Sequence, residues 1–465
     1  MAVENEISYS INFSQDLLYI ILDSYISKNF EAHEQYYDFV DENDIRTRLN
    51  CANGQFTSTR KVCTSIKKMV HVHDNILVPF VNRCCMEKES PQKSATLKRI
   101  VKCVVYKSAE CPECEIKFEH VYFNKTLVDK FDSLMASKQI ALWNLLQNKN
   151  ERMIKESHLG SDEILAALRL EYEYNDNDID VRVLNYMAEL IHKIDSMTWY
   201  QNINPLLPYT TLQNNIIYRK FEDEKLIKDT NDDCIVDDEE AKIYKWALKL
   251  DGVRGKGFFT RNFMIVFMDD MRMYSSPFEN NIFALNNVVA FQCEMMDRTL
   301  YITDLLHVFK YSYNNQTQYE VSMDPYHVEP ADAVDCINRL AKKFNNDPSL
   351  CLNTICGTTV NVKFQQFFNP PIMKMGYSTM PVDGFIVLDT QMNYVKYKRY
   401  KTVEMEYDDE QKLFCSLKGP MTQQQSVTID DSVVRPLQHQ AIYEAIVDDN
   451  SIHILKLRPD RLIPN

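Results

Sequence analysis

The segment best suited to nucleophilic chemistry spans Lys249 to Arg254 and reads K-L-D-G-V-R. A lysine amine attacks an electrophile only when it is neutral, and burial or a neighbouring cation lowers its pKa toward the working pH. Arg254 supplies such a cation, and Gly252 lets the backbone come close to a ligand. The segment makes Lys249 a candidate nucleophile. On spacing alone, an exposed strand end with a salt bridge is the better explanation of these residue types.

Charged residues that could serve such a nucleophile follow in the C-terminal half of the chain. They are, in order, Glu294, Asp304, Asp383, Lys396, Lys398, Arg458 and Asp460. Each alone has an ordinary explanation, such as a solvated charge, a strand-edge lysine that blocks aggregation, or a frayed terminus. In this order behind Lys249, they resemble the covalent nucleotidyltransferases, the superfamily of mRNA capping enzymes and ATP-dependent ligases.

This resemblance extends over roughly residues 245–465 and implies a role for each matching position. Lys249 would attack the α-phosphorus of a nucleoside triphosphate and form a phosphoramidate, and Lys396 would help to keep Lys249 neutral. Asp383 would be a metal-site carboxylate. The positions implied to bind GTP or GMP are Asp251, Arg254, Glu294, Tyr301, Lys396, Lys398, Arg458 and Asp460.

Two positions depart from the superfamily pattern. Thr303 stands where an aromatic side chain usually stacks on the base, so Tyr301, two residues earlier, is the expected substitute. Cys293 stands where glycine usually precedes the motif glutamate. Arg458 and Asp460 match the last motif, which lies on an OB-fold lid that closes over the leaving pyrophosphate. The resemblance therefore implies a nucleotidyltransferase domain followed by an OB-fold.

Two pairs of glutamates in the N-terminal half have the spacing of a strand. Glu4 and Glu6 form one E-x-E, and Glu171 and Glu173 form the other. A period of two puts both carboxylates of a pair on one face of a strand. Two such strands facing each other would surround divalent cations, which prefer oxygen ligands, with carboxylates. One pair alone is better explained as outward polar positions, but the two pairs together favour a metal site.

Basic residues also alternate on the predicted strands of the N-terminal half. They are Arg46, Arg48, Lys67, Lys117 and Arg169. If they point inward with the glutamates, one barrel holds metal at one side and a polyphosphate at the other. This pattern resembles the metal-dependent tunnel family of RNA triphosphatases. The resemblance implies that these basic residues bind the triphosphate of RNA.

The whole chain resembles the baculovirus late expression factor four family, in which a tunnel triphosphatase precedes a guanylyltransferase. The resemblance implies a bifunctional mRNA capping enzyme. Such an enzyme removes the γ-phosphate of nascent 5′-triphosphate RNA and then transfers GMP from GTP, through a lysyl-GMP intermediate, to the diphosphate end. It also implies a divalent metal, Mg²⁺ or Mn²⁺, and assembly with other subunits of a viral RNA polymerase in the host cell nucleus.

Strands must position most of these residues, with helices packed outside them. Alternation predicts strands over Glu4–Ile11, Tyr36–Val40, Ile45–Leu49, Val62–Val72, Ile100–Val105, Ile116–Phe123, Ala167–Asn175 and Asp383–Leu388. Helical periodicity predicts helices over Asn12–Ile26, Phe131–Leu146, Val181–Ile194 and Pro330–Phe344. The predicted fold is α+β and multidomain, with an N-terminal antiparallel β-tunnel and flanking helices, a central nucleotidyltransferase domain and a C-terminal OB-fold.

Charge and composition place the boundaries. An acidic stretch at residues 222–240 has few apolar residues and is predicted to be a solvated connection between domains. The predicted organisation is a triphosphatase over residues 1–221, an acidic linker over 222–240, a nucleotidyltransferase over 241–400 and an OB-fold lid over 401–465.

Overall composition limits the class of protein. The 465 residues carry a net charge of −14, so any nucleic-acid contact must use local basic patches. The acidic N-terminus and the lack of a ~20-residue apolar run argue against a signal peptide and a membrane span. The 13 cysteines are therefore expected as free thiols in a reducing compartment. Zinc binding at Cys111-x-x-Cys114 stays open.

Two other classes of function compete with the capping enzyme. An ATP-dependent polynucleotide ligase shares the K-x-D-G-x-R core, and the two E-x-E pairs argue against it. A polymerase scaffold subunit with decayed sites is disfavoured by the retained lysines and carboxylates. Labelling with GTP or ATP distinguishes the first two, and loss of both activities in pure protein would identify the third.

Overall fold

The computed structural model describes most of the chain in segments. The described residues are 2–124, 165–175, 178–198, 209–227, 234–236, 242–261, 263–277, 282–313, 319–347, 350–353, 359–373, 382–417, 419–420, 426–448, 451–459, 461, 463 and 464. The chain forms two compact units. Unit 1 comprises residues 1–207, 283–287 and 308–327, and unit 2 comprises residues 208–282, 288–307 and 328–465.

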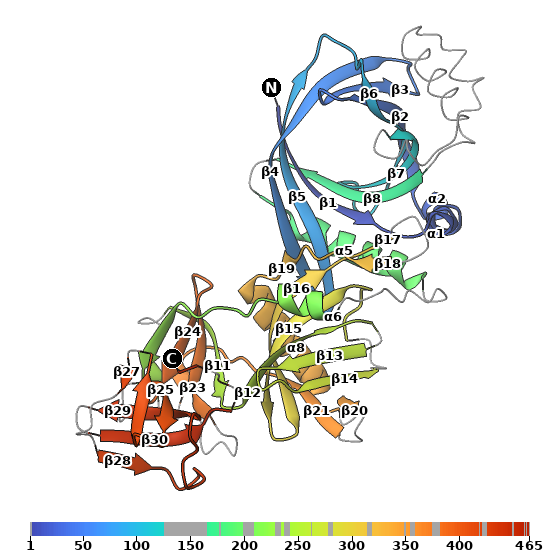
Figure 1. Cartoon of the computed structure of the whole chain (residues 1–465). Coiled ribbons are helices and arrows are strands. Elements are labelled where there is room, and N and C mark those ends of the chain that lie inside the picture. Colours follow the sequence, from blue (N-terminus) through green and yellow to red (C-terminus); the bar gives the residue numbers. More distant parts are fainter. Residues whose placement is uncertain are drawn as a thin grey trace. The chain divides into compact units, whose positions relative to one another are not determined.

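Unit 1 is built on a closed barrel of eight strands, which confirms the predicted N-terminal antiparallel tunnel (Figure 1). Every neighbouring pair in the barrel is antiparallel, in the order β1-β5-β4-β3-β2-β6-β7-β8. The strands are β1 (Ala2–Ile11), β2 (Glu31–Asp41), β3 (Ile45–Asn50), β4 (Phe56–His73), β5 (Ile76–Glu89), β6 (Leu97–Lys107), β7 (Cys114–Asn124) and β8 (Leu165–Tyr174).

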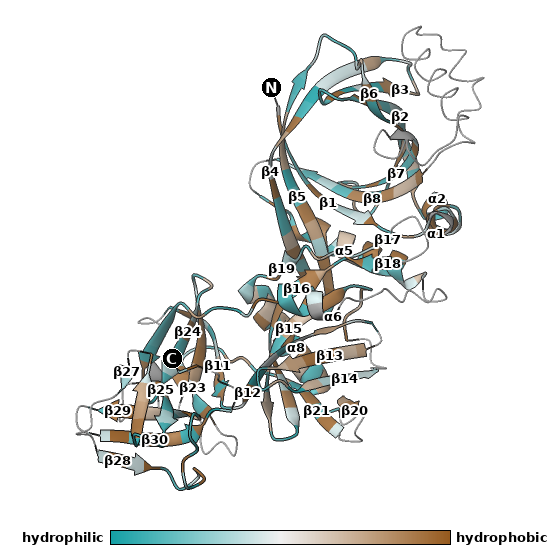
Figure 2. Ribbon diagram, viewed as in Figure 1, coloured by the Kyte–Doolittle hydropathy of each residue, from teal (hydrophilic) through white to brown (hydrophobic). Residues whose placement is uncertain are grey.

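Apolar residues on the outer face of the barrel pack against helices. In β1, Ile7 and Ile11 are buried in this outer core, whereas Glu6 and Ser8 face the opposite way, into the barrel. Figure 2 shows hydrophilic and hydrophobic residues mixed along the barrel strands, as this two-sided pattern requires. The covering elements are α1 (Gln15–Ile21), the π-helical turn η1 (Leu22–Ile26), α2 (Ser27–Asn29) and α5 (Val181–Ser196).

Helix α5 has clear start and packing signals. The Asp180 side chain accepts a hydrogen bond from the backbone N–H of Arg182 at 2.9 Å, which caps the helix. Val183, Met187 and Ile191 lie on the buried face at helical spacing. The short elements β17 (Tyr311–Tyr313), β18 (Tyr319–Val321) and β19 (Tyr326–His327) complete unit 1.

Unit 2 contains two principal sheets before its C-terminal part. One has the order β11-β23-β24-β9 and the other β14-β13-β12-β15-β16-β21-β20, while β10 pairs with β22. The elements are α6 (Tyr209–Asn215), β9 (Asp223–Leu226), β10 (Cys234–Val236), β11 (Ile243–Leu250), β12 (Val253–Phe259), β13 (Phe263–Met268), β14 (Met273–Pro277), β15 (Val288–Met296), β16 (Thr299–Phe309), α8 (Pro330–Phe344), β20 (Cys351–Asn353), β21 (Thr359–Phe364), β22 (Ile372–Met373), β23 (Val382–Asp389) and β24 (Tyr394–Lys398).

The C-terminal part of unit 2 is a six-stranded sheet with its own core. Its order is β27-β26-β25-β29-β30-β28, and Met405, Tyr443 and Ile454 are buried at its centre. The strands are β25 (Thr402–Asp408), β26 (Leu413–Ser416), β27 (Gly419–Pro420), β28 (Ser426–Ile429), β29 (Ile442–Asp448) and β30 (Ser451–Leu457).

The described residues are mostly β with few helices, so the α+β prediction overestimated the helical content. Helix α8 has its predicted bounds, and the predicted helix over Phe131–Leu146 lies outside the described residues. The acidic stretch predicted as a solvated connection begins with β9, whose residues are exposed and pair in parallel with β24. Among the described residues, no helix is long and apolar enough to cross a membrane.

Candidate functional site

The barrel register gathers the predicted glutamates on its inner face. Residues directly opposite each other on antiparallel strands share a face. Glu6 lies opposite Glu173, and Ser8 lies opposite Glu171, which in turn lies opposite Glu115 on β7. Glu6 and Glu171 are 6% and 2% exposed, which is low for carboxylates. The inner wall formed by β1, β8 and β7 therefore carries a cluster of carboxylates.

Three of these carboxylates could hold a metal ion together. The carboxylate oxygens of Glu115, Glu171 and Glu173 all lie within 4.8 Å of one another, and this is the one such group among the described residues. Burial raises the pKa of Glu173, and the negative charges of Glu4, Glu115 and Glu171 raise it further. Mutual repulsion of this kind is what a divalent cation relieves, so the donor set fits a hard metal.

Glu115 was not predicted from the sequence, although the alternation E-x-K-x-E at Glu115, Lys117 and Glu119 is a usable signal. The predicted ligands Glu4 and Glu6 are instead paired with cations in this structure. Glu4 accepts a hydrogen bond from Lys61 at 2.6 Å, and Glu6 accepts one from Arg83 at 3.2 Å.

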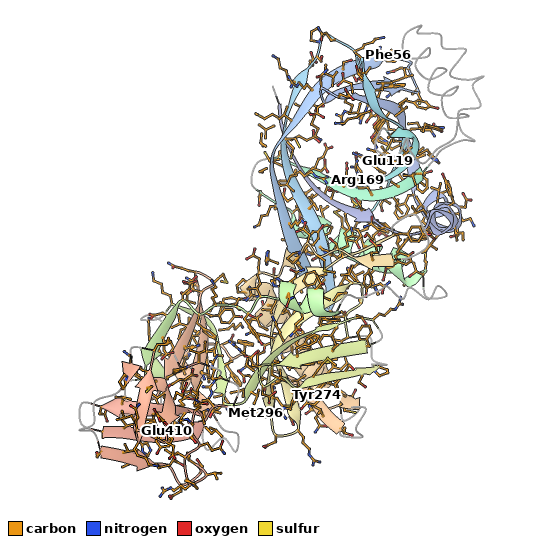
Figure 3. All side chains as sticks on the ribbon, in the orientation of Figure 1. Phe56, Glu119, Arg169, Tyr274, Met296 and Glu410 are labelled. Atoms are coloured by element: carbon orange, nitrogen blue, oxygen red, sulfur yellow. The ribbon has the colours of Figure 1, made fainter. Side chains whose placement is uncertain are left out.

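The predicted basic residues share the same inner face, apart from Lys67. Lys117 forms ion pairs with Glu171 and, at 3.0 Å, with Glu115. Arg169 pairs with Glu171 and, at 3.2 Å, with Glu119. Figure 3 shows Glu119 and Arg169 directed into the barrel. Burial alone would raise the pKa of Glu171, but the charges of Arg169 and Lys117 outweigh it and lower that pKa.

The other two predicted arginines bind carboxylates further along the inner wall. Arg48 donates two hydrogen bonds to Asp38, at 2.8 and 2.9 Å, and its guanidinium lies 3.5 Å from the centre of the Tyr36 ring. Arg46 pairs with Glu87 at 2.8 Å. The interior therefore holds alternating positive and negative groups, which suits binding of a polyphosphate together with a metal.

Lys67 was predicted to point inward, and the structure shows that this is wrong. The register of β4 against β5 shifts between Cys63 and Ser65, so one extra residue enters β4. A one-residue shift moves every later side chain to the other face. Lys61, opposite Glu87, is on the inner face, whereas Lys67, opposite Asn82, is on the outer face and exposed.

Unit 2 contains a cavity of about 360 Å³, and the predicted nucleophile Lys249 is among the residues that line it. Polar and charged side chains from both principal sheets and from the C-terminal sheet line it. Among them are Lys249, Asp251, Arg254, Glu294, Asp383, Lys396, Lys398 and Arg458, which were all predicted from the sequence. Asp460 lies outside the described residues.

Lys249 and Asp383 meet at the same end of two neighbouring strands. Lys249 is at the end of β11, Asp383 is at the start of β23, and the Lys249 Nζ donates to the Asp383 Oδ2 at 2.8 Å. The next residue, Gly384, has a φ of +105°, and a Cβ there would lie 1.9 Å from the Tyr397 carbonyl oxygen. Only glycine therefore allows β23 and β24 to approach each other beside this pair.

Glu294 lies across the strand pair from Arg254. These residues face each other on β15 and β12, and the Oε2 of Glu294 is buried with no hydrogen-bond partner among the described residues. Burial raises the pKa of Glu294 to about 7, although the charges of Lys249 and Arg254 lower it. Arg254 itself pairs with Asp269 at 2.8 Å. The free carboxylate oxygen is an acceptor available to a ligand hydroxyl or amine.

A second lysine of the cavity sits against an aromatic ring. The Lys396 Nζ lies 4.4 Å from the centre of the Phe221 ring, and Lys398 lines the same wall. Burial lowers the pKa of Lys396, and the positive charges of Lys398 and Lys249 lower it further. The three amines therefore repel one another in the absence of an anion.

Basic residues of the C-terminal sheet are held by acidic neighbours. Arg458 pairs with Glu404 and with Glu444, both at 3.0 Å, and Arg461 pairs with Glu404 at 3.0 Å. Lys456 forms an ion pair with Asp251 of the lysine motif. Glu444, Lys456 and Arg461 were not predicted from the sequence, because their contacts depend on pairing of strands distant in sequence.

The predicted base-stacking residue is not where it was expected. Thr303 lines the cavity, whereas Tyr301 is not among the described residues that do. Two aromatic residues that sequence analysis missed, Tyr218 and Phe221, line it instead. The Arg254 guanidinium lies 4.1 Å from the Tyr218 ring centre, and the Tyr218 hydroxyl donates to Asp269 at 2.7 Å.

Known proteins match this chain over nearly its whole length. The family model for Late expression factor 4 (LEF-4) matches residues 4–465. The mRNA capping enzyme LEF-4 of Autographa californica nuclear polyhedrosis virus is 46% identical over 473 residues, covering 100% of this chain and 98% of the relative. The mRNA capping enzyme LEF-4 of Orgyia pseudotsugata multicapsid polyhedrosis virus is 39% identical over 472 residues, with the same coverage.

A structural similarity to the mimivirus capping enzyme triphosphatase is weak. It covers 41% of this chain and 88% of that chain, at 13% identity and a TM-score of 0.22, which is too low to carry an argument. The full-length relatives decide the matter. They place the chain in the class of mRNA capping enzymes. Within that class, the chain belongs to the Late expression factor 4 family, as its motifs predicted.

Proposed function

We propose that unit 2 transfers GMP from GTP to RNA through a covalent intermediate on Lys249. One observation carries the proposal: a single cavity holds Lys249 with the carboxylates and cations of the lysine motif, both principal sheets and the C-terminal sheet. The lysines and arginines of the cavity can bind a polyphosphate through charge-assisted hydrogen bonds. The Oε2 of Glu294, which has no hydrogen-bond partner among the described residues, can accept a hydrogen bond from a nucleoside hydroxyl. The proposed domains are a nucleotidyltransferase over residues 241–400 and an OB-fold lid over 401–465.

The Lys249–Asp383 ion pair is the arrangement of this site without bound nucleotide. An ammonium held by a carboxylate cannot attack phosphorus, so Lys249 must leave Asp383 and release a proton to water before the attack. Burial and the positive charges of Lys398 and Lys249 lower the pKa of Lys396, which favours its neutral form beside Lys249. Asp383 then becomes available to a cation, and Mg²⁺ is commonly held by one or two carboxylates together with substrate phosphates.

Labelling with GTP tests this proposal. The chain incubated with α-³²P-GTP and separated under denaturing conditions should carry label, and Lys249→Ala should abolish it. Lys249→Arg should fail as well, because a guanidinium stays protonated and cannot attack. Lys245→Ala is the matched control, because Lys245 lies on the same strand and does not line the cavity. Label that persists in Lys249→Ala, or label from ATP alone, would contradict the proposal.

We propose that the barrel of unit 1 removes the γ-phosphate of triphosphate RNA before that transfer. The support is the inner wall, where Glu115, Glu171 and Glu173 can hold a divalent cation beside Lys117 and Arg169. When bound, the cation neutralises charge on the transferring phosphoryl group. Arg46, Arg48, Lys117 and Arg169 orient the triphosphate through charge-assisted hydrogen bonds. Glu4 and Glu6 complete the acidic wall.

Membership of the late expression factor family supports the remaining assignments. We propose that the chain works with other subunits of a viral RNA polymerase in the host cell nucleus, where it would meet the 5′ end of nascent RNA. Purification of the tagged chain from infected nuclei tests this. Polymerase subunits should co-purify in stoichiometric amounts, and recovery of the chain alone would contradict it.

A further inference from the structure

Unit 1 contains a cavity of about 380 Å³ at the C-terminal end of β1, and neither proposed reaction has been assigned to it. It is lined from the inner face of β1 by Ser8 and Ser10 and from β5 by Arg83, and β4 adds Lys68. Lys310, Ser312, Ser322 and Asp324 of the segment after β16 form the opposite wall. All of these residues belong to unit 1.

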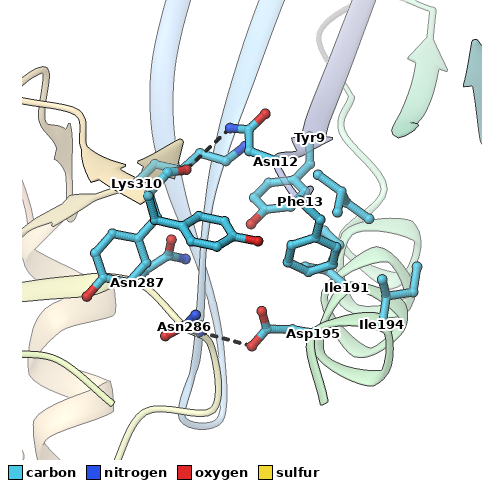
Figure 4. A pocket seen from close by; sticks show the side chains of 12 residues that line it. Tyr9, Asn12, Phe13, Ile191, Ile194, Asp195, Asn286, Asn287 and Lys310 are labelled. Carbon is cyan, nitrogen blue, oxygen red and sulfur yellow. Dashed lines mark hydrogen bonds between the residues drawn. The ribbon is translucent and has the colours of Figure 1, made fainter. Parts of the chain in front are cut away.

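Lys310 is the unusual member of this lining. Its Nζ donates to the Ser10 carbonyl oxygen and lies 3.7 Å from the centre of the Tyr9 ring. Figure 4 shows Lys310 beside Asn12 and Tyr9, at the border of a smaller cavity of about 30 Å³. Among the described residues, no carboxylate pairs with Lys310, and burial lowers its pKa to about 7.

The other two cations of the cavity are compensated. Lys68 pairs with Asp324, and Arg83 pairs with Glu6 at 3.2 Å. Burial disfavours the charged form of Lys310, and an anion bound in the cavity would restore that charge. Serine hydroxyls and the Asn12 amide add neutral donors around it. An oxyanion with a single negative charge and several acceptor oxygens matches this set, and a phosphodiester has that chemistry.

The position of the cavity indicates which phosphodiester. Arg83 lines the cavity and donates at 3.2 Å to both Glu6 and the Ser8 hydroxyl. Ser8 lies directly opposite Glu171 of the proposed metal-binding wall. Ser8 therefore links the lining of this cavity to the strand position of Glu171.

We propose that this cavity binds the first internucleotide phosphate of the RNA, so that unit 1 recognises a triphosphate attached to an RNA chain. The inference rests on the proposed triphosphatase activity of the barrel. Lys310 supplies the charge, and the hydroxyls of Ser8, Ser312 and Ser322 supply neutral donors. A free nucleoside triphosphate has no such phosphate and gains nothing from the cavity.

The length of the substrate tests the proposal. Phosphate release is measured for GTP and for 5′-triphosphate oligonucleotides of two and three nucleotides, with wild type, Lys310→Met and Lys310→Gln. Methionine keeps most of the aliphatic length of lysine without its charge, and glutamine keeps a neutral N–H donor. We expect kcat/KM for the oligonucleotides to fall by about tenfold or more, as for loss of one charged hydrogen bond, with little change for GTP. Where GTP is a poor substrate, its inhibition constant replaces kcat/KM.

Lys67→Met is the matched control, because Lys67 precedes Lys68 on β4 and faces the outside of the barrel. Fluorescence anisotropy with labelled forms of the same oligonucleotides, without added metal, measures their binding independently of hydrolysis. A wild type that binds longer oligonucleotides no better than GTP would overturn the inference, whether or not it hydrolyses them. Equal losses for GTP and RNA would also overturn it. Weaker inhibition by orthophosphate as the sole effect of the Lys310 variants would overturn it too, because the cavity would then bind the phosphate product.

Discussion

At the scale of single residues, pairing of charges decides what each group in the unit 2 cavity can do. Lys249 is held by Asp383, and Arg254 is held by Asp269, each at 2.8 Å. Glu294 is the exception, because one of its oxygens is buried without a hydrogen-bond partner among the described residues. A buried carboxyl without compensation prefers its neutral form.

The raised pKa of Glu294 makes stability depend on pH. Its folded-state pKa is about 7 against an ordinary value of 4.5, so the folded protein holds this proton more tightly than the unfolded chain. The stabilisation is complete below the ordinary value and is lost as the pH rises through about 7. We predict that Glu294→Gln raises Tm relative to wild type at about pH 8 and much less at about pH 5.

Thermal unfolding monitored at both pH values measures this difference. At ~1.36 kcal/mol for each unit of pKa, the gain at high pH is at most about 3 kcal/mol. Glu410→Gln is the control, because Glu410 is exposed. A Glu294→Gln change in Tm that is equal at both pH values would show that the carboxyl does not titrate between them in the folded protein.

At the scale of elements, the register shift in β4 decides which lysine serves the barrel. Before the shift, Lys61 faces inward and contacts Glu4 at 2.6 Å and Glu6 at 3.6 Å. After it, Lys67 faces outward. The bulge therefore places on opposite faces two lysines that an unbroken alternation would place on the same face.

We predict that Lys61→Met lowers triphosphatase activity by about tenfold or more, since it leaves Glu4 without its cation and removes a positive charge from the inner wall. Lys67→Met should retain wild-type activity. Phosphate release from triphosphate RNA measures both. Comparable losses in the two variants would mean that β4 has no register shift in solution.

The strand end at Arg458 is the second element that we expect to matter. Arg458 follows β30, lines the cavity and pairs with Glu404 and Glu444. To bind a polyphosphate, Arg458 would have to break these two ion pairs. One well-placed donor in a transition state contributes about 3–4 kcal/mol. Arg458→Ala should therefore slow GMP-adduct formation by roughly a hundredfold or more, at ~1.4 kcal/mol per tenfold.

Transfer of GMP from a preformed adduct should suffer less in Arg458→Ala, because pyrophosphate has already left. Arg435→Ala is the control, since Arg435 lies in the C-terminal part and does not line the cavity. Single-turnover measurements of adduct formation and of GMP transfer separate the two steps. Adduct formation at the wild-type rate would refute the role of Arg458.

At the scale of the whole molecule, the two proposed reactions lie in different compact units. The carboxylate wall proposed to bind metal belongs to unit 1 and the Lys249 cavity to unit 2. We predict that Glu171→Ala lowers phosphate release by about a hundredfold or more, because a metal ligand is lost, while the GMP adduct forms normally. Glu189→Ala, at an exposed position of α5, should leave both activities intact. A parallel fall in both activities of a folded Glu171→Ala protein would show that the units depend on each other.

The sequence alone determined the family, seven of the eight barrel strands and eight of the charged side chains that line the unit 2 cavity. Strand alternation placed Glu171 and Arg169 on one face, and motif order linked Lys249 to Asp383 and Arg458, because these signals are local or short in pattern. Only the tertiary structure decided the rest. Lys67 faces outward because of a bulge, and Tyr218 and Phe221 line the unit 2 cavity where Tyr301 was expected.

The physical reason is that each of these outcomes depends on pairing between distant strands. Glu115 joins Glu171 through the β7–β8 register, and Lys310 reaches Ser10 across 300 residues of chain. A bulge or a cavity wall belongs to two or more segments at once, so no single segment carries its signal. Residue type and local period therefore specified the chemistry available, and the closure of the barrel and the packing of the sheets specified which groups share it.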